Sequence, residues 1–226
     1  MTHNTDLRYE IKLTCDPHWL HQARSWIRMH SEGFGVAYPP RRVNSLYLDT
    51  LALTGLNENL VGVIERQKLR LRWYGDVLTE VKPNLELKQK YNMLGNKKVY
   101  PFPCPLDLTQ PWQDVLSVIR ANVPPEWQIL LQTVNQPALL NRYQREYYVT
   151  PDGAVRATLD FDQIAYDQRL SPHLNLCYPL VMPDNVVVEL KAAQEHLKRL
   201  EEIAGGFPIP RSRNSKYVRG LLSALG

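Results

Sequence analysis

Cysteine is scarce in this sequence, which has only three among 226 residues: Cys15, Cys104 and Cys177. No CxxC spacing occurs, so neither a disulfide framework nor a cysteine-ligated zinc site is indicated, and a reducing compartment is the simplest interpretation. Apolar runs are also short, because none approaches the roughly 18 residues that a membrane-spanning helix needs. The first residues, MTHNTDL, lack the apolar core of a signal peptide. We therefore expect a cytoplasmic protein.

The excess of positive charge is small, with 27 Lys and Arg against 23 Asp and Glu and a formal net charge of +4. This balance favours anionic partners in general but is too weak to single out nucleic acid, which we do not expect as a partner. Glycine-rich phosphate loops of the P-loop type are absent from the sequence. With 44% hydrophobic and 22% charged residues, the composition is that of an ordinary globular protein.

The pattern along the chain predicts strands and helices without a repeat or a low-complexity linker. We expect one α+β domain over residues 1–226, with a helical insertion near 105–135 that follows a proline-rich loop. The turn Thr150-Pro151-Asp152-Gly153 predicts an antiparallel hairpin around it. The expected strands cover 8–14, 43–50, 63–74, 85–90, 138–149, 154–167 and 186–191, and the main terminal helices cover 18–30, 192–204 and 216–225.

Charged residues recur in phase within several of these strands. In the segment ERQKLRLRWY, which begins at Glu65, side chains alternate between the two faces of a strand, so Lys68, Arg70 and Arg72 lie on one face. A solvated outer face would explain any single strand of this kind. The set of strands favours a closed antiparallel barrel, in which alternate residues line the interior and the others pack under helices.

Such an interior would hold more cations than carboxylates and would therefore need a mobile polyanion. Arginine offers paired donors to phosphate oxygens and lysine a compact charge, so a mixed lining suits a chain of phosphates. The expected interior cations and acids are Lys12, Lys68, Arg70, Arg72, Lys88, Arg156, Lys191, Glu10, Glu86 and Glu189.

Carboxylates among these cations could hold Mg²⁺ or Mn²⁺ bridged to phosphate oxygens. We expect Glu189, with Glu10, to be the metal ligands. Asp160 could bind metal or close a turn, and the pattern does not separate these roles. Ser215 and Lys216 lie at an expected helix start, where an anion could also use free backbone N–H groups, although Ser215 could be only a cap.

Short motifs in order along the chain resemble the VTC (vacuolar transporter chaperone) polyphosphate polymerase domain of the triphosphate tunnel metalloenzyme superfamily. They are RYEIK (8–12), SLYLDT (45–50), KLRLRWYG (68–75), LELK (85–88), NRYQREYY (141–148), VRATLD (155–160), VVELK (187–191) and SKYVRG (215–220). The resemblance implies a closed antiparallel barrel of eight strands, a triphosphate tunnel with flanking helices. It also implies a metal-dependent transfer of the γ-phosphate of ATP to a polyphosphate chain, with release of ADP.

Carried over by position, the resemblance implies roles for individual residues. Arg70, Arg72, Lys88 and Glu189 are expected to act in catalysis, and Arg213 stands where a lysine is expected. The residues expected to bind phosphate or nucleotide are Lys12, Lys68, Arg70, Arg72, Lys88, Arg142, Arg156, Lys191, Arg213, Ser215 and Lys216.

Two alternatives stay open at this point. The first is a tripolyphosphatase or nucleoside triphosphatase of the same tunnel fold, and the second is a polyphosphate-binding module without turnover. The hydrolase branch is marked by an N-terminal ExExK, whereas Arg8 stands here in place of the first glutamate. The expected partners are ATP and polyphosphate or another triphosphate, and the resemblance leaves room for a membrane-protein partner in export.

Overall fold

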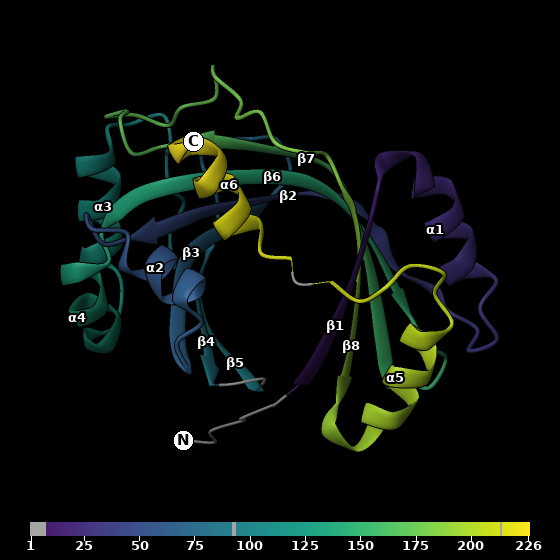
Figure 1. The fold of residues 1–226 in the computed structure, drawn as a ribbon. Helices are drawn as coiled ribbons and strands as arrows, with labels where there is room; N and C mark the ends of the chain where they lie inside the picture. The colour runs from purple at the N-terminus through teal and green to yellow at the C-terminus, as the bar shows by residue number, and fades with distance from the viewer. Residues whose placement is uncertain (1–7, 92–93, 213) are drawn as a thin grey trace.

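Eight antiparallel strands form a closed ring in the computed structural model, which describes residues 8–91, 94–212 and 214–226. The strand order around the ring is β1-β5-β4-β3-β2-β6-β7-β8 (Figure 1). The fold class predicted from the sequence is thereby confirmed. The strands are β1 (Arg8–Cys15), β2 (Gly35–Asp49), β3 (Glu65–Tyr74), β4 (Asn84–Tyr91), β5 (Leu94–Pro101), β6 (Gln136–Val149), β7 (Val155–Asp167) and β8 (Val186–Ala193).

Helices cover the outside of the ring on two sides, as Figure 1 shows. On one side, α3 (Trp112–Ala121) and α4 (Pro125–Thr133) pack on a core that includes Leu69, Leu71 and Trp73 of β3. On the other side, α1 (Leu20–Arg28) and α5 (Leu197–Gly205) pack on apolar residues of β1, β7 and β8. The apolar residues of β1, β3, β7 and β8 therefore point outward to the helices, and the charged residues that alternate with them point into the ring.

The helix α6 (Lys216–Leu225) lies on the inner side of β6 (Figure 1). Tyr217 and Leu221 pack on Leu139, which shares the inner face of β6 with Tyr143. The contact is close, because a Cβ atom on Gly220 would lie 2.5 Å from Cδ2 of Leu139. The Tyr217 hydroxyl also donates to the Asp49 carboxylate, which caps the start of α2 (Thr54–Val61). This packing fixes the N-terminus of α6 inside the ring.

The seam between β1 and β5 is the least paired part of the ring. Within the described residues, one pair, Arg8 with Gly95, joins these strands. Farther along β1, the connection between α5 and α6 takes the place of β5, since Ser212 N donates to Lys12 O at 2.9 Å and Arg211 bridges to Leu13. We call residues 206–212 and 214–215 the strap.

Several elements differ in extent from the sequence-based expectation. The strand β2 begins at Gly35 rather than near residue 43, because the long β6 strand offers it partners as far as Val149. The strand β5 was not expected, since its sequence LGNKKVYP has little β character of its own. The expected helix over 192–204 begins later, as β8 continues to Ala193 and α5 starts at Leu197.

A few short elements complete the fold. Single 3-10 turns cover Pro17–Trp19 and Gln194–His196, before α1 and α5. Across the described ranges, no helix has the length and apolar character required to cross a bilayer.

Candidate functional site

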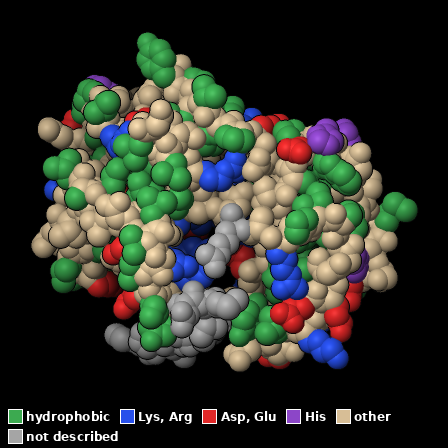
Figure 2. Space-filling view, viewed as in Figure 1, with side chains coloured by type: hydrophobic (Ala, Val, Ile, Leu, Met, Phe, Trp, Pro, Cys, Tyr) green, Lys and Arg blue, Asp and Glu red, His purple; other side chains and the backbone are tan. Residues whose placement is uncertain are grey.

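The inner face of the ring carries charge from nearly every strand, and we call this region the lumen. Figure 2 shows a hollow at the centre of the molecule with lysine or arginine atoms on its floor and acidic atoms beside them. Strand registers place these residues on one face, and the cations outnumber the carboxylates. The lumen contains Lys12, Lys68, Arg70, Arg72, Lys88, Lys97, Arg145, Arg156, Lys191 and Lys216, together with Glu10, Glu86, Asp160 and Glu189.

Glu86 anchors one group of lumen cations. Its carboxylate contacts Arg70 at 2.6 Å, Lys97 at 3.2 Å and Arg72 at 3.9 Å. Burial would raise the pKa of Glu86, but Arg70, Arg72 and Lys97 outweigh it and lower the pKa to about 2. Arg72 also donates to the hydroxyls of Ser45 and Tyr143, each at 3.1 Å. The two guanidinium groups are therefore held in place before any ligand enters.

Asp160 anchors a second group and joins α6 to the ring. It receives two hydrogen bonds from Arg145, at 2.5 and 2.7 Å, and one from the Lys216 ammonium group at 2.6 Å. Asp160 is fully buried, yet Arg145 and Lys216 overcome the effect of burial and lower its pKa. The Lys216 ammonium also lies 4.6 Å from the Tyr143 ring centroid. Asp160 thus orients two cations toward the lumen.

Glu10 and Glu189 form a third group with two lysines between them. Lys12 lies 2.7 Å from Glu10 and 3.6 Å from Glu189, and Lys191 contacts both carboxylates as well. Burial and Glu189 would raise the pKa of Glu10, but Lys88, Lys12 and Lys191 lower it to about 2. Burial likewise opposes ionisation of Glu189, yet the neighbouring cations, led by Lys191, hold its pKa well below the usual value.

This third group is suited to a divalent cation. Both carboxylates stay ionised and share the same two ammonium neighbours, so both face the same part of the lumen. Within the described residues, no cluster of three or more acidic, histidine or cysteine side chains could hold a metal. Mg²⁺ is commonly bound by one or two carboxylates together with substrate phosphates and water. The donor set therefore fits a metal that shares its coordination with a phosphate ligand.

Lys68 differs from the other lumen cations in its partners. Its ammonium group donates to Ser215 Oγ at 2.8 Å and lies 5.5 Å from the Tyr217 ring centroid. Salt bridges from Lys68 to a carboxylate are absent among the described residues. Burial, followed by the repulsion of Lys88 and Lys12, lowers the pKa of Lys68 to about 7. This position lacks the negative charge that an anionic ligand would supply.

The strap and the start of α6 bring the last predicted residues into the lumen. The Lys12 ammonium donates to Asn214 O at 3.1 Å, which fixes the strap across β1. Ser215 caps α6, because its Oγ accepts a hydrogen bond from Val218 N at 3.4 Å. The same hydroxyl receives the Lys68 hydrogen bond, so the cap and the lumen share this atom. The cap was one of the two roles that the sequence left open.

Most of the residues predicted to bind phosphate or metal come together in the lumen. Arg156 lies on the lumen face of β7 opposite Lys191 but is exposed to solvent. Arg213 lies outside the described residues. The residues that converge are Glu10, Lys12, Lys68, Arg70, Arg72, Lys88, Glu189, Lys191, Ser215 and Lys216.

Arg142 is not brought to this group, which corrects the sequence-based placement. Its Nε donates to Asn44 Oδ1 at 2.8 Å and its Nη2 to Asp76 Oδ1 at 2.7 Å, on the outer face of β6. Arg145 occupies the lumen instead. The two residues are three positions apart, so a strand necessarily turns them to opposite faces. The motif NRYQREYY identified the strand β6 but not which of its residues face the lumen.

Sequence reasoning also missed Arg145, Lys97 and Tyr143 as lumen residues. The alternation of Tyr143 and Arg145 along β6 was a usable signal, once the inward phase was known. Lys97 was missed because β5 itself was not expected. For Asp160, the ion pairs with Arg145 and Lys216 give it a structural role in place of the turn that the pattern allowed.

Comparisons with solved structures show the same fold in other proteins. One is HpAC1, an adenylyl cyclase-type protein from Hippeastrum described as having a dominant triphosphatase activity. It is 15% identical with a TM-score of 0.57, over 96% of this chain and 95% of that one. Another is the PH1819 protein from Pyrococcus horikoshii OT3, which is 12% identical with a TM-score of 0.52, over 96% and 99% of the two chains. At these identities the likeness concerns the fold.

A family model gives the assignment at the level of sequence. No curated protein matches the chain. The model of the VTC domain matches residues 7–225, which is nearly the whole chain. The ring of eight antiparallel strands agrees with the tunnel fold that the sequence motifs implied. The chain therefore belongs to the VTC domain family.

Proposed function

We propose that this protein is a metal-dependent polyphosphate polymerase, which transfers the γ-phosphate of ATP to a polyphosphate chain and releases ADP. The observation that carries this proposal is the convergence of lysine and arginine side chains on one lumen with too few carboxylates to balance them. Unbalanced charge in a confined space is costly unless a ligand neutralises it. A linear polyanion supplies negative charge along the whole length of such a site.

Individual residues have distinct roles in this proposal. Arg70 and Arg72 are already oriented by Glu86, Ser45 and Tyr143, so they can hold phosphate oxygens without a further ordering cost. Lys12, Lys68, Lys88, Arg145, Arg156, Lys191, Ser215 and Lys216 complete the phosphate contacts.

Glu10 and Glu189 would hold Mn²⁺ or Mg²⁺, which neutralises charge on the phosphate oxygens when it is bound. In the transfer itself, a terminal phosphate oxygen of the chain bonds to the γ-phosphorus. The bond from that phosphorus to the β,γ-bridging oxygen breaks, and ADP departs with the electron pair. The fixed cations stabilise the charge that develops, so no protein nucleophile is required.

A triphosphatase is the second candidate. The fold likeness to the Hippeastrum protein, which is described as having a dominant triphosphatase activity, favours it. The same lumen residues would bind the triphosphate, and water would replace the polyphosphate chain as the attacking group. A polyphosphate-binding module without turnover is the third candidate.

The products of one incubation separate these candidates. We would incubate the purified protein with ATP and Mn²⁺ or Mg²⁺, with and without a short polyphosphate primer, and resolve polyphosphate, ADP and free phosphate. A polymerase gives lengthening chains with ADP, a triphosphatase gives free phosphate without chains, and a binding module gives neither.

Glu189→Gln provides the first test of the site. The amide cannot supply the negative charge that a divalent cation needs, so we expect turnover to fall by at least about 100-fold with an unchanged circular dichroism spectrum. Glu195→Gln is the matched control, because the Glu195 side chain is 77% exposed and lies outside the lumen. Full activity in Glu189→Gln would remove Glu189 from the metal site.

A further inference from the structure

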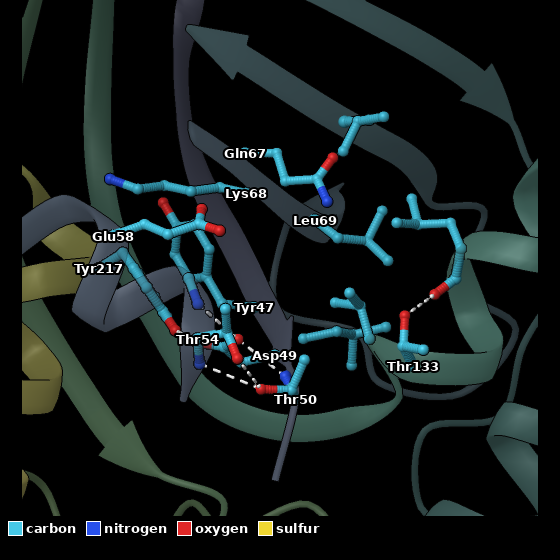
Figure 3. A pocket seen from close by; sticks show the side chains of 15 residues that line it. Tyr47, Asp49, Thr50, Thr54, Glu58, Gln67, Lys68, Leu69, Thr133 and Tyr217 are labelled. Carbon is cyan, nitrogen blue, oxygen red and sulfur yellow. Dashed lines mark hydrogen bonds between the residues drawn. The ribbon is translucent and has the colours of Figure 1, made fainter. Parts of the chain in front are cut away.

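A cavity of about 200 Å³ opens beside the lumen, at the end of the ring where β2 stops and β3 begins. The ends of those two strands, the first turns of α2, the last turn of α4 and Tyr217 of α6 surround it. Figure 3 shows Glu58, Lys68, Tyr47 and Tyr217 on one side of the cavity and Leu69 and Thr133 on the other. Of the residues that line it, Lys68 alone was assigned a phosphate contact above.

The cavity and the lumen share a wall. Lys68 lines the cavity, and its ammonium group donates to Ser215 Oγ at the start of α6. Tyr47 also lines it, and the Tyr47 hydroxyl accepts a hydrogen bond from Arg70 at 3.3 Å. A ligand in the cavity would therefore lie next to the cations that are proposed to hold phosphates.

The lining of the cavity differs in chemistry from the lumen. Leu69, Leu87 and Val134 give it an apolar wall, while Glu58 and Gln67 add a carboxylate and an amide. A polyphosphate chain gains nothing from leucine side chains and is repelled by a carboxylate. An aromatic base would bury its faces on the apolar wall, and ribose hydroxyls could donate to Glu58. The lining thus suits a nucleoside better than a phosphate chain.

The size of the cavity supports the same assignment. Pockets that enclose a whole drug-sized ligand usually measure about 300–1,000 Å³. A cavity of about 200 Å³ is too small for a complete nucleoside triphosphate but can take one part of it. The highly charged remainder would extend past Lys68 into the lumen.

We propose that this cavity receives the base and ribose of a nucleoside triphosphate whose phosphates lie in the lumen. The inference rests on the proposed function and adds the direction in which the nucleotide enters. The base lies against the leucines, the ribose faces Glu58, and the phosphates run from Lys68 and Ser215 toward the Glu10 and Glu189 pair. The phosphate that is transferred is then the one nearest the carboxylates.

The test compares two ligands that differ only in the nucleoside. We would measure the affinities of ATP and of inorganic tripolyphosphate by calorimetry, with Ca²⁺ in place of the catalytic metal to limit turnover. Thr133→Trp fills the cavity from its rim, where Thr133 is exposed. We expect ATP affinity to fall by about tenfold or more, as when a substrate loses its pocket, with tripolyphosphate affinity unchanged within about twofold.

Two further variants make the test decisive. Gln132→Trp places the same side chain at the neighbouring position of α4, which is exposed and does not line the cavity, so it should change neither affinity. Glu58→Gln replaces the charged ribose acceptor by a weaker, neutral one with little change in shape, and it should weaken the binding of ATP alone. If Thr133→Trp fails to fold by circular dichroism, the Glu58→Gln comparison decides.

The outcomes distinguish the inference from the proposed function. A loss confined to ATP supports the nucleoside site. Equal losses for both ligands, or no loss for either, overturn the inference while leaving the phosphate lumen in place. If the unmodified protein binds neither ATP nor tripolyphosphate, the proposed function fails and this inference fails with it.

Discussion

At the scale of single residues, the most informative side chain is Lys68. Its pKa of about 7 lies well below the value near 10.4 of a free lysine. Between these two values the unfolded chain binds a proton that the folded protein lacks. The free energy of unfolding should therefore rise as the pH increases from about 7 to about 10.4, because the penalty for charging Lys68 is relieved.

The same shift predicts proton uptake on ligand binding. An anion beside Lys68 favours the charged ammonium group, so tripolyphosphate binding at pH 8 should draw a proton from the buffer. Calorimetry in buffers of different ionisation enthalpy measures this uptake. We expect most of it to disappear in Lys68→Gln, and an undiminished uptake in that variant would assign the proton to another group.

Arg142 and Arg145 offer a matched pair on one strand. Arg145 faces the lumen beside Asp160, whereas Arg142 faces outward to Asn44 and Asp76. We expect Arg145→Gln to reduce tripolyphosphate affinity by about 10- to 100-fold, the effect of losing a charge-assisted contact, with Arg142→Gln within about twofold of the unmodified protein. A larger loss of affinity in Arg142→Gln than in Arg145→Gln would mean that Arg142, and not Arg145, faces the lumen.

At the scale of elements, the sequence predicted the ring where periodicity was strong. The alternation of Lys68, Leu69, Arg70 and Leu71 correctly predicted which face of β3 points into the ring, because half-buried strands leave a period-two pattern. The sequence-based prediction failed where local signals are weak. The strand β5 depends on pairing with β4 rather than on its own residues, and the strap depends on backbone groups of β1 that no sequence pattern records.

The candidate site was predictable in part for the same reason. Charges in phase on separate strands predicted that Glu10, Lys12 and Glu189 meet, and they do. The choice between Arg142 and Arg145 depends on which face meets Asp76 and which meets Asp160, and these are partners distant in sequence. Only the assembled fold decides between them.

The docking of α6 yields a prediction for this element. A methyl group on Gly220 would overlap the fully buried Leu139 side chain, so Gly220→Ala should destabilise the protein by about 1–3 kcal/mol through overpacking. Tripolyphosphate affinity should also fall, because α6 begins at Lys216 and is capped by Ser215. Thermal unfolding and calorimetry measure the two effects.

Gly205→Ala provides the control for this change. It also adds a methyl group to a helical glycine, but open space surrounds that position at the end of α5. Stability there should stay within about 1 kcal/mol of the unmodified protein. If both variants behave alike, the close contact of α6 with β6 does not determine the position of Lys216.

At the scale of the whole molecule, the lumen sets how the protein responds to anions. A ligand that binds only the folded state adds about 2.7 kcal/mol of stability at 100 times its Kd. We expect tripolyphosphate to raise the melting temperature in this way, and more so at low salt, where charges are less screened. Sulfate at matched ionic strength is the control, and an equal shift with sulfate would argue against a site for linear phosphate chains.

The strand β1 is paired unequally with its two neighbours in the ring, and this determines where the ring can open. Parting β1 from β8 would break a ladder of eight residue pairs, whereas one described pair joins β1 to β5. Across that weak joint, the Lys88 ammonium group of β4 contacts the Glu10 carboxylate of β1 at 3.3 Å. A polyanionic ligand that attracts Lys88 competes with this contact. The ring should therefore widen most easily between β1 and β5, and only while such a ligand is bound.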